Sequence, residues 1–259
     1  MKQFIKSYLK TLLFFAIIGL IGGFFVGIYQ IESFPPEIQE MLIEEINGSG
    51  LGGSPELILG IVSAFQSALY GFALGAIGIL IGKRIGLWKD ETKIEIGPLM
   101  QAILISAICG LVMIFSDILV FGKYSEALMD SYAVKPTVPY MIATVTYGGV
   151  IEEVMLRLFF MSVVAFILYK LFEKNKDMPS TPVLVASNIV ASLLFAAGHL
   201  PATDLMLGLT PMLIFRCFLL NGGLGLAFGW LYRRHGLRYS MIAHAGCHVV
   251  SKLIWILFI

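Results

Sequence analysis

Residues 140–170 read YMIATVTYGGVIEEVMLRLFFMSVVAFILYK, an apolar run that contains two adjacent acids and one arginine. A charged side chain at the centre of a bilayer costs roughly 2.5–3.5 kcal/mol on insertion scales, so these charges need partners or a water-filled cavity. On a helix, Glu153 and Arg157 are four positions apart and can pair along one face. Glu152 is rotated about 100° away from Glu153. We therefore expect Glu152 to find its partners on other helices of a bundle.

The composition is that of a membrane protein. The chain has 259 residues, of which 58% are hydrophobic and 14% are charged, whereas soluble domains carry about 25% charged residues. The formal net charge of +1 gives no field that would attract nucleic acid. Cys109, Cys217 and Cys247 lie far apart in apolar runs and are odd in number, so no disulfide framework is expected. The partner that the composition does predict is the lipid bilayer.

Seven stretches are long enough to cross a hydrocarbon core, which takes about 20 apolar residues. We therefore predict an all-α fold, a polytopic transmembrane helical bundle with about seven spanning helices, in a single domain over residues 1–259. Glycines four positions apart, as in Gly19, Gly23 and Gly27, favour close packing between such helices. The predicted spans are residues 11–29, 57–82, 98–121, 139–170, 181–200, 208–232 and 239–259.

Basic residues are unequally divided between the two ends of the predicted spans. With the N-terminus inside, the inner segments hold thirteen Lys and Arg residues and the outer segments hold two. Because cytoplasmic loops carry the excess of Lys and Arg, we expect a cytoplasmic N-terminus and a multi-pass protein of the cell membrane. The inner residues are Lys2, Lys6, Lys10, Lys83, Arg84, Lys89, Lys93, Lys170, Lys174, Lys176, Arg233, Arg234 and Arg238, and the outer ones are Lys123 and Lys135.

The fourth span contains two glycines just before its acidic pair. One interpretation is a single long tilted helix from Tyr140 to Lys170; another is a short entry segment, a break at Gly148-Gly149 and then the main helix. The second interpretation would place Glu152 near a helix N-terminus, where a carboxylate is stabilised. The sequence leaves both open.

Three of the four histidines lie in apolar surroundings. His199 follows Phe195 by four positions, and His244 and His248 are four apart on one helix face. Two kinds of chemistry fit these rings and Glu152. The glutamate can act as general base on a water molecule with one histidine, while the others donate to an oxyanion. Alternatively, the histidines and the glutamate can bind zinc and leave a position for water.

These residues form three motifs in chain order: Glu152-Glu153-x-x-x-Arg157, Phe195-x-x-x-His199 and His244-x-x-x-His248. Together they resemble the signature of the type II CAAX prenyl endopeptidases, whose bacterial members are grouped as CPBP or abortive-infection-like proteins. The resemblance covers residues 137–250 as a motif-bearing protease core. Residues 1–135 would then supply the N-terminal helices.

The resemblance implies an intramembrane glutamic protease that acts on a peptide or a membrane-associated protein. Glu152 would activate water together with His199, and His244 and His248 would form the oxyanion hole. Glu153 and Arg157 would hold the geometry of the site. No cofactor is implied, with zinc as the alternative.

His248 departs from the family pattern, which usually has Asn or Asp at this position. A neutral imidazole donates one hydrogen bond, so an oxyanion role requires the correct tautomer. The same histidine makes a zinc site more plausible and leaves a non-catalytic member open. The predicted spans also place His199 near the outer end of its helix but His244 only a turn or two into the last one. Tilted or shortened helices must bring these two rings together.

Other classes of protein also contain buried acids and histidines. A proton- or cation-coupled transporter is one alternative, although we find no internal repeat of the kind that many transporters show. A scaffold whose polar cluster only joins helices is another. A Cys247 nucleophile assisted by His244 is disfavoured, because no cation near Cys247 would stabilise its thiolate. Asp117 and Arg216 are expected to have structural roles, and Lys252 has no evident role.

Overall fold

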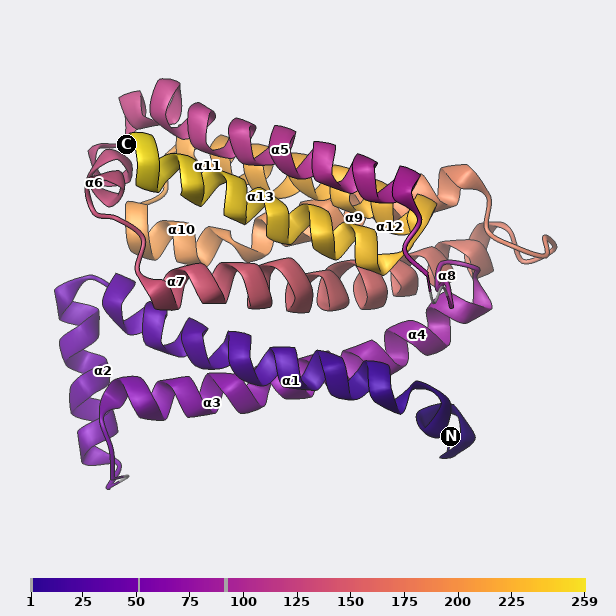
Figure 1. Ribbon diagram of the computed structural model, residues 1–259, viewed down its shortest axis with the longest axis horizontal. Coiled ribbons are helices and arrows are strands. Elements are labelled where there is room, and N and C mark those ends of the chain that lie inside the picture. The colour runs from indigo at the N-terminus through magenta and orange to yellow at the C-terminus, as the bar shows by residue number, and fades with distance from the viewer. Residues whose placement is uncertain (1, 51, 91–92) are drawn as a thin grey trace.

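The structure is a computed structural model that describes residues 2–50, 52–90 and 93–259 (Figure 1). The chain is 86% helical, and no strand occurs among the described residues. Seven helical segments are long and apolar enough to cross a membrane. The predicted all-α, multi-pass membrane fold is therefore confirmed.

The spanning segments start and end within a few residues of the predicted ones, with one exception. The fifth continues to Leu207, seven residues beyond the predicted end at residue 200. Helix α9 ends at Gly198 and α10 begins at Leu200, so His199 lies between two consecutive helices of one span. The seven segments are Lys6–Ser33, Pro55–Arg84, Ile96–Tyr124, Val138–Phe172, Thr181–Leu207, Pro211–His235 and Leu237–Phe258.

Several spans contain short π-helical turns between their α-helical parts. The α-helices are α1 (Lys2–Ser33), α2 (Pro36–Gly48), α3 (Pro55–Leu69), α4 (Gly75–Arg84), α5 (Ile96–Leu119), α6 (Glu126–Ala133), α7 (Val138–Ala143), α8 (Ser162–Phe172), α9 (Thr181–Gly198), α10 (Leu200–Leu207), α11 (Pro211–Cys217), α12 (Leu224–His235) and α13 (Leu237–Phe258). The π-helical segments are η1 (Tyr70–Leu74), η3 (Thr144–Glu152), η4 (Val154–Met161) and η5 (Phe218–Gly223), and η2 (Phe121–Tyr124) is a 3-10 helix.

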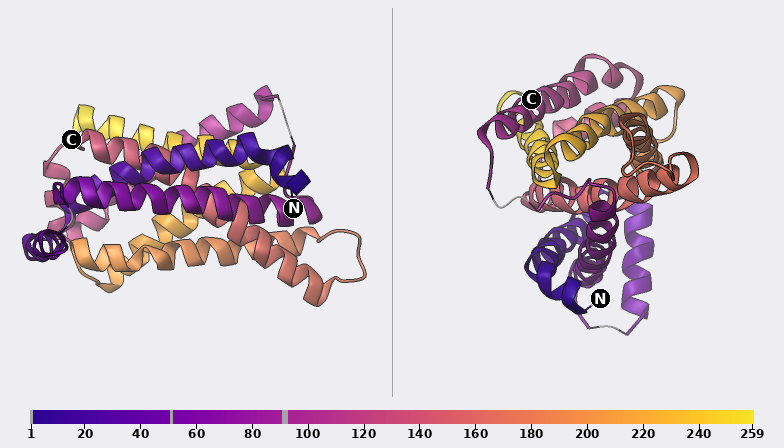
Figure 2. Two further views of the ribbon diagram at one scale, coloured as in Figure 1. Left: turned by 90° about the horizontal axis from the view of Figure 1, so that it is seen from below. Right: turned by 90° about the vertical axis from the view of Figure 1, so that its right-hand side faces the viewer.

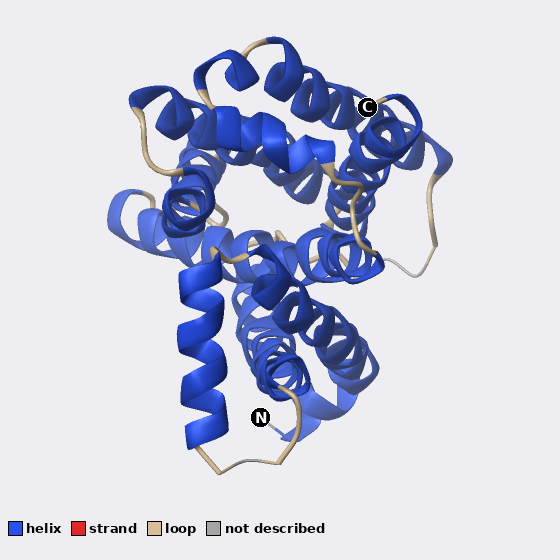
Figure 3. Ribbon diagram, turned by 90° about the vertical axis from the view of Figure 1, so that its left-hand side faces the viewer, coloured by secondary structure: helices blue, strands red, loops and turns tan. Residues whose placement is uncertain are grey.

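The fourth span lies between two groups of helices. Helices α1 and α4 pack on one side of it, with α3 packed on α1, and α5 with α9 to α13 lies on the other (Figures 1 and 2). Helix α2 stands across one end of the bundle, and none of its residues is buried (Figure 3). The first group packs closely: a Cβ on Gly19 of α1 would lie 2.6 Å from the carbonyl oxygen of Ser67 of α3. The glycine spacing in the first span thus marks a close helix contact.

The fourth span is one continuous helix from Val138 to Phe172. The interpretation with a break at the glycines is therefore wrong, and Glu152 is not near a helix N-terminus. The glycines instead allow α13 to approach: a Cβ on Gly149 would lie 2.5 Å from the Cβ of Ala245. This approach brings the acidic pair against the helix that carries His244 and His248.

A buried ion pair joins helices on the second side of the bundle. Arg216 of α11 donates from Nε and Nη2 to the two carboxylate oxygens of Asp117 in α5, each at 2.6 Å. The hydroxyl of Tyr132 in α6 donates to the same carboxylate at 2.8 Å. Asp117 is fully buried. Two of the intramembrane charges therefore neutralise each other in a structural contact, as expected from the sequence.

Candidate active site

A cavity of about 720 Å³ reaches into the bundle, and Glu152, His199, His244 and His248 all line it. They come from η3, the junction of α9 and α10, and α13. This volume lies within the roughly 300–1,000 Å³ of typical ligand sites. The structure therefore brings the four predicted catalytic residues to one shared space in an otherwise apolar bundle.

Glu153 lies behind this cavity and is fully buried. Its Oε1 accepts a hydrogen bond of 2.9 Å from Nδ1 of His244, and Nη1 of Arg157 lies 3.4 Å from the same oxygen. The hydroxyl of Ser240 donates to Oε2. A carboxylate with these three partners is held as an anion and is poorly placed to receive a proton from substrate water. Glu153 can position His244 instead.

Arg157 is held from several directions. Its Nη2 donates to the carbonyl oxygen of Gly225 at 2.9 Å. The guanidinium lies over the rings of Phe195 and Phe228, 5.0 and 5.9 Å from their centroids. Cation–π contacts of this kind contribute more when the cation is desolvated. Arg157 thus connects the fourth, fifth and sixth spans behind the cavity and neutralises Glu153.

The bond to Glu153 determines the tautomer of His244. A carboxylate only accepts, so Nδ1 of His244 carries the proton and Nε2 of the neutral ring is an acceptor. This Nε2 lies 4.0 Å from Oε2 of Glu152. The ring stacks on Phe228 with a centroid separation of 4.6 Å. His244 can therefore exchange a proton with the cavity through Nε2, and it can donate to an oxyanion only as the imidazolium.

The neutral ring of His199 has the same tautomer as that of His244. Its Nδ1 lies 2.8 Å from the carbonyl oxygen of Phe195, which only accepts, so Nε2 of the neutral ring is again an acceptor. The rings of His199 and His244 both contact Phe195, at centroid distances of 4.6 and 6.1 Å. The expected mismatch in depth does not keep the two rings apart. The fifth span extends eight residues past His199, so this residue does not lie at the outer end of its span.

His248 stacks on His244, with ring centroids 5.1 Å apart. A Cβ built on Gly148 would lie 3.1 Å from Nε2 of His248 and 3.9 Å from Oε2 of Glu152. The missing side chain at Gly148 therefore leaves space between these two groups. On the other edge of the ring, Nζ of Lys252 lies 3.4 Å from Nδ1.

A metal would have to be held by the same side chains. Within the described ranges, no group of three or more His, Cys, Asp or Glu side chains is arranged to hold a metal ion. One nitrogen of His244 is bonded to Glu153 and one of His199 to Phe195. The zinc alternative requires these side chains to rearrange, and it stays a prediction for experiment.

Comparison with known families covers the same region. Residues 134–250 match the model described as type II CAAX prenyl endopeptidase Rce1-like, and all three motifs lie within the match. This segment is therefore similar to the Rce1-like family. The resemblance inferred from the motifs is thereby confirmed for this segment, and the family supports a peptidase in a multi-pass membrane protein. Comparisons with curated proteins and with solved structures gave no match.

The matched segment also contains candidate site residues that were not predicted from the sequence. Ser240 contacts Glu153, and the ring of Phe228 contacts both His244 and the guanidinium of Arg157. A signal was present for part of this set, because Ser240, His244, His248 and, just beyond the match, Lys252 recur every four positions along α13. Residues at that spacing share one helix face. No comparable signal identified Phe228.

Proposed function

We propose that this protein is an intramembrane glutamic peptidase that cleaves a peptide or a membrane-associated protein, with water activated by Glu152. The observation that carries the proposal is the state of Glu152. Among the described residues it has no hydrogen-bond partner, and Nε2 of His244 is 4.0 Å from its Oε2. It lines a cavity together with three imidazoles. A carboxylate kept in apolar surroundings without a fixed partner is available to a water molecule.

In the proposed mechanism, Glu152 accepts a proton from water as the oxygen attacks the peptide carbonyl. Glu152 returns this proton to the leaving nitrogen, either directly or after transfer to Nε2 of His199, which is an acceptor in the neutral ring. The C–N bond breaks, the acid that forms gives its remaining hydroxyl proton to the released amine, and the products are a carboxylate and an ammonium group. Groups that donate to the developing oxyanion lower the barrier because they are already oriented. His248 is the candidate donor, and His244 can join it when protonated.

The remaining charged residues act through these groups. Glu153 fixes Nδ1 of His244, and Arg157 compensates the charge of Glu153. Both are proposed as positioning residues. The family match to a protease supports this assignment of the cavity.

The test uses purified protein and a library of internally quenched peptides in detergent and in proteoliposomes. We expect Glu152→Gln and His199→Ala to abolish cleavage while both variants remain folded. The control is Glu45→Gln, an exposed carboxylate on α2, which is expected to cleave like the parent. Full activity in either site variant would refute the proposal.

The zinc alternative predicts different behaviour in the same assay. A metal-dependent enzyme would lose cleavage on chelation, regain it with added zinc, and contain stoichiometric metal by elemental analysis. We expect cleavage to persist in chelator. Loss and recovery with zinc would replace the glutamic mechanism with a metal-assisted one.

A further inference from the structure

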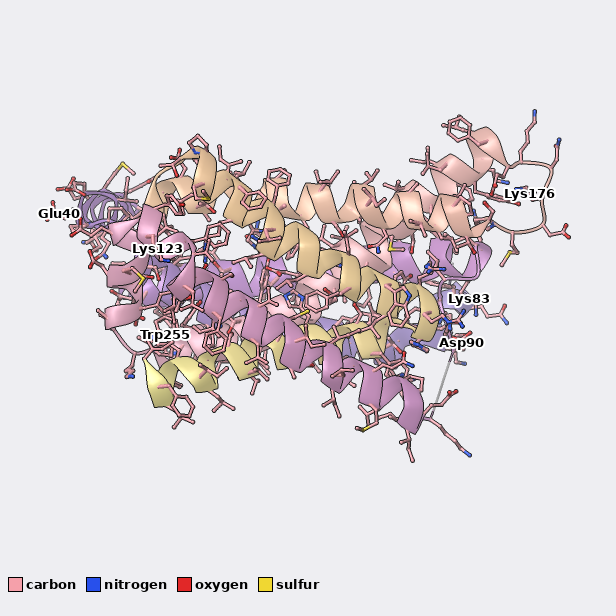
Figure 4. All side chains as sticks on the ribbon, turned by 90° about the horizontal axis from the view of Figure 1, so that it is seen from above. Glu40, Lys83, Asp90, Lys123, Lys176 and Trp255 are labelled. Atoms are coloured by element: carbon pink, nitrogen blue, oxygen red, sulfur yellow. The ribbon has the colours of Figure 1, made fainter. Side chains whose placement is uncertain are left out.

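The cavity opens at one end of the bundle, and the basic loops lie at the other. Figure 4 shows Lys83 and Lys176 at one end, and Glu40, Lys123 and Trp255 at the opposite end. Trp255 lines the cavity. At the first end, α4 and α12 finish with Lys83-Arg84 and Arg233-Arg234.

In α1, the fourth span and α13, the residues that line the cavity come from one part of the helix only. Helix α1 contributes residues from Val26 onward, and the fourth span contributes none beyond Glu152. Helix α13 contributes none before His244. The cavity thus ends at the level of Glu152 and His244, and none of the basic residues at the first end lines it.

We propose that the site takes its substrate from the extracytoplasmic side of the membrane, which deepens the proposed function and rests on it. Cytoplasmic loops carry the excess of Lys and Arg, and these loops lie at the end away from the mouth. The occupant is an extended peptide segment exposed on the outer side, next to the membrane boundary of its parent protein.

The walls of the cavity fit that occupant. The mouth carries one acidic and one basic side chain, Glu32 and Lys135. Behind them, the rings of Tyr29 and Tyr140 stack with centroids 4.4 Å apart. Aromatic walls with few charges can contact the apolar side chains of a peptide. The two charged side chains at the mouth can bind its backbone or neighbouring polar residues.

Cysteine accessibility in intact cells tests the sidedness without requiring peptidase activity. Ser131→Cys places a thiol at the mouth, Asn221→Cys places one deeper along the cavity wall, and Asn175→Cys places one in the α8–α9 loop at the basic end. The native cysteines are buried, and the parent protein measures their background. The probes are a membrane-impermeant maleimide for the exposed positions and a small charged methanethiosulfonate for Asn221→Cys.

We expect the Ser131→Cys and Asn221→Cys variants to react in intact cells, and the Asn175→Cys variant to react only after permeabilisation. Reaction of Asn175→Cys in intact cells would overturn the proposal, because the bundle would then be inverted. Labelling of Ser131→Cys without external labelling of Asn221→Cys would also overturn it, because no aqueous path would lead inward from that side. If the labelling contradicts the proposed orientation but Glu152→Gln still abolishes cleavage, only the sidedness is refuted and the proposed peptidase function stands.

A separate observation concerns Lys252, which is 3% exposed. Its Nζ lies 4.5 Å above the centroid of the Tyr140 ring and 3.4 Å from Nδ1 of His248. Among the described residues it forms no ion pair with a carboxylate. An ammonium group only donates, so Nδ1 of His248 accepts and the proton of the neutral ring is on Nε2.

The geometry points to Lys252 as a positioning residue for His248 in the proposed reaction. With the proton on Nε2, His248 presents a donor beside Gly148 and the cavity. The side-chain amide of an asparagine at position 248 would present an equivalent N–H. His248 and Lys252 together would thus replace one side chain.

A double-mutant cycle tests this pairing. We expect Lys252→Met to lower kcat by about tenfold with little change in KM, less than the about 10²–10³-fold loss for removal of an oxyanion donor. Lys252→Arg, which keeps a donor, should recover most of the activity. His248→Asn should be active, and in that background Lys252→Met should change kcat little.

Two outcomes would overturn the assignment. An equal loss from Lys252→Met in both backgrounds would show that Lys252 acts on the fold and not through His248. An inactive but folded His248→Asn variant would show that the ring does not substitute for an amide donor. Inactivity of the parent protein on every peptide would instead refute the proposed function.

Discussion

Nδ1 of His244 donates to Oε1 of Glu153 across 2.9 Å, between two side chains that are 91 positions apart in the chain. The bond leaves the other ring nitrogen, Nε2, 4.0 Å from Glu152. Two adjacent glutamates therefore contact opposite edges of one imidazole. Glu153 fixes the tautomer of the His244 ring, and Glu152, which lines the cavity, can exchange a proton with Nε2 of that ring.

Glu153→Gln should inactivate the enzyme and also destabilise it. The amide cannot compensate Arg157, and removal of one partner of a buried ion pair costs about 3–5 kcal/mol. Its amide can also donate to His244 and so release the ring from a single tautomer. Thermal unfolding in detergent and cleavage by the folded fraction measure the two effects. Glu40→Gln on the exposed face of α2 is the control, and equal stability of the two variants would contradict this account.

Much of the bundle could be predicted from the sequence, because apolar length determines where a helix can cross a bilayer. The ends of the spans were harder to predict. Leu200-Pro201 reads as a helix end, yet Pro201 occupies the first turn of α10, where proline is tolerated, and the span continues to Leu207. The position of His199 inside the span, and not at its end, was therefore not predicted.

The candidate site was predictable where its residues are ionisable, because an ionisable side chain inside a membrane is costly and therefore marks a candidate functional residue. Glu152 and the three histidines were predicted in this way, and all four line one cavity. Phe228 was not found, because an aromatic residue in an apolar span carries no distinguishing signal. The glycine pair was ambiguous, because a glycine can mark either a break or a close helix contact.

Asp117→Asn should lower stability without removing a group of the proposed reaction. Asp117 is fully buried and accepts both bonds from Arg216. The variant leaves a largely buried guanidinium without its counter-charge, at a cost of about 3–5 kcal/mol. The double variant Asp117→Asn, Arg216→Met should be more stable than Asp117→Asn alone. Thermal unfolding of the three proteins tests this, and an unchanged midpoint for Asp117→Asn would contradict it.

The loop between α8 and α9 should respond to acid through Glu173. This carboxylate accepts bonds of 2.6 Å from Nζ of Lys176 and 2.7 Å from the backbone N–H of Ser180. Bonds from Lys176 and Ser180 lower the pKa of Glu173 to about 2 from its ordinary 4.5. Because the folded pKa is the lower one, the contribution to loop stability is complete above pH 4.5 and is lost as the pH falls toward 2.

Hydrogen exchange of the loop amides across this range measures the effect. We expect protection of the parent loop to decrease between about pH 4.5 and 2, after correction for intrinsic exchange. Glu173→Gln should be less protected at neutral pH and should lack this acid-dependent step. Glu126→Gln, which changes an exposed carboxylate on α6, serves as the control and should behave like the parent. The same acid-dependent step in Glu173→Gln would assign the loss to another group.

Alanine substitutions at the two glycines should separate the fold from the site. In Gly149→Ala the new methyl group would lie 2.5 Å from the Cβ of Ala245, so α13 must move away from the fourth span. Overpacking of this kind costs about 1–3 kcal/mol. In Gly148→Ala the nearest atom is Nε2 of His248 at 3.1 Å, and the methyl group enters space between His248 and Glu152.

We therefore expect Gly149→Ala to lower both stability and activity, and Gly148→Ala to lower activity with a smaller loss of stability. Gly97→Ala in the first turn of α5, where nothing lies within 4 Å of the new atom, should leave both unchanged. Unfolding midpoints and cleavage rates of the three variants test this order, and a fully active Gly148→Ala protein would mean that substrate does not use the space beside His248.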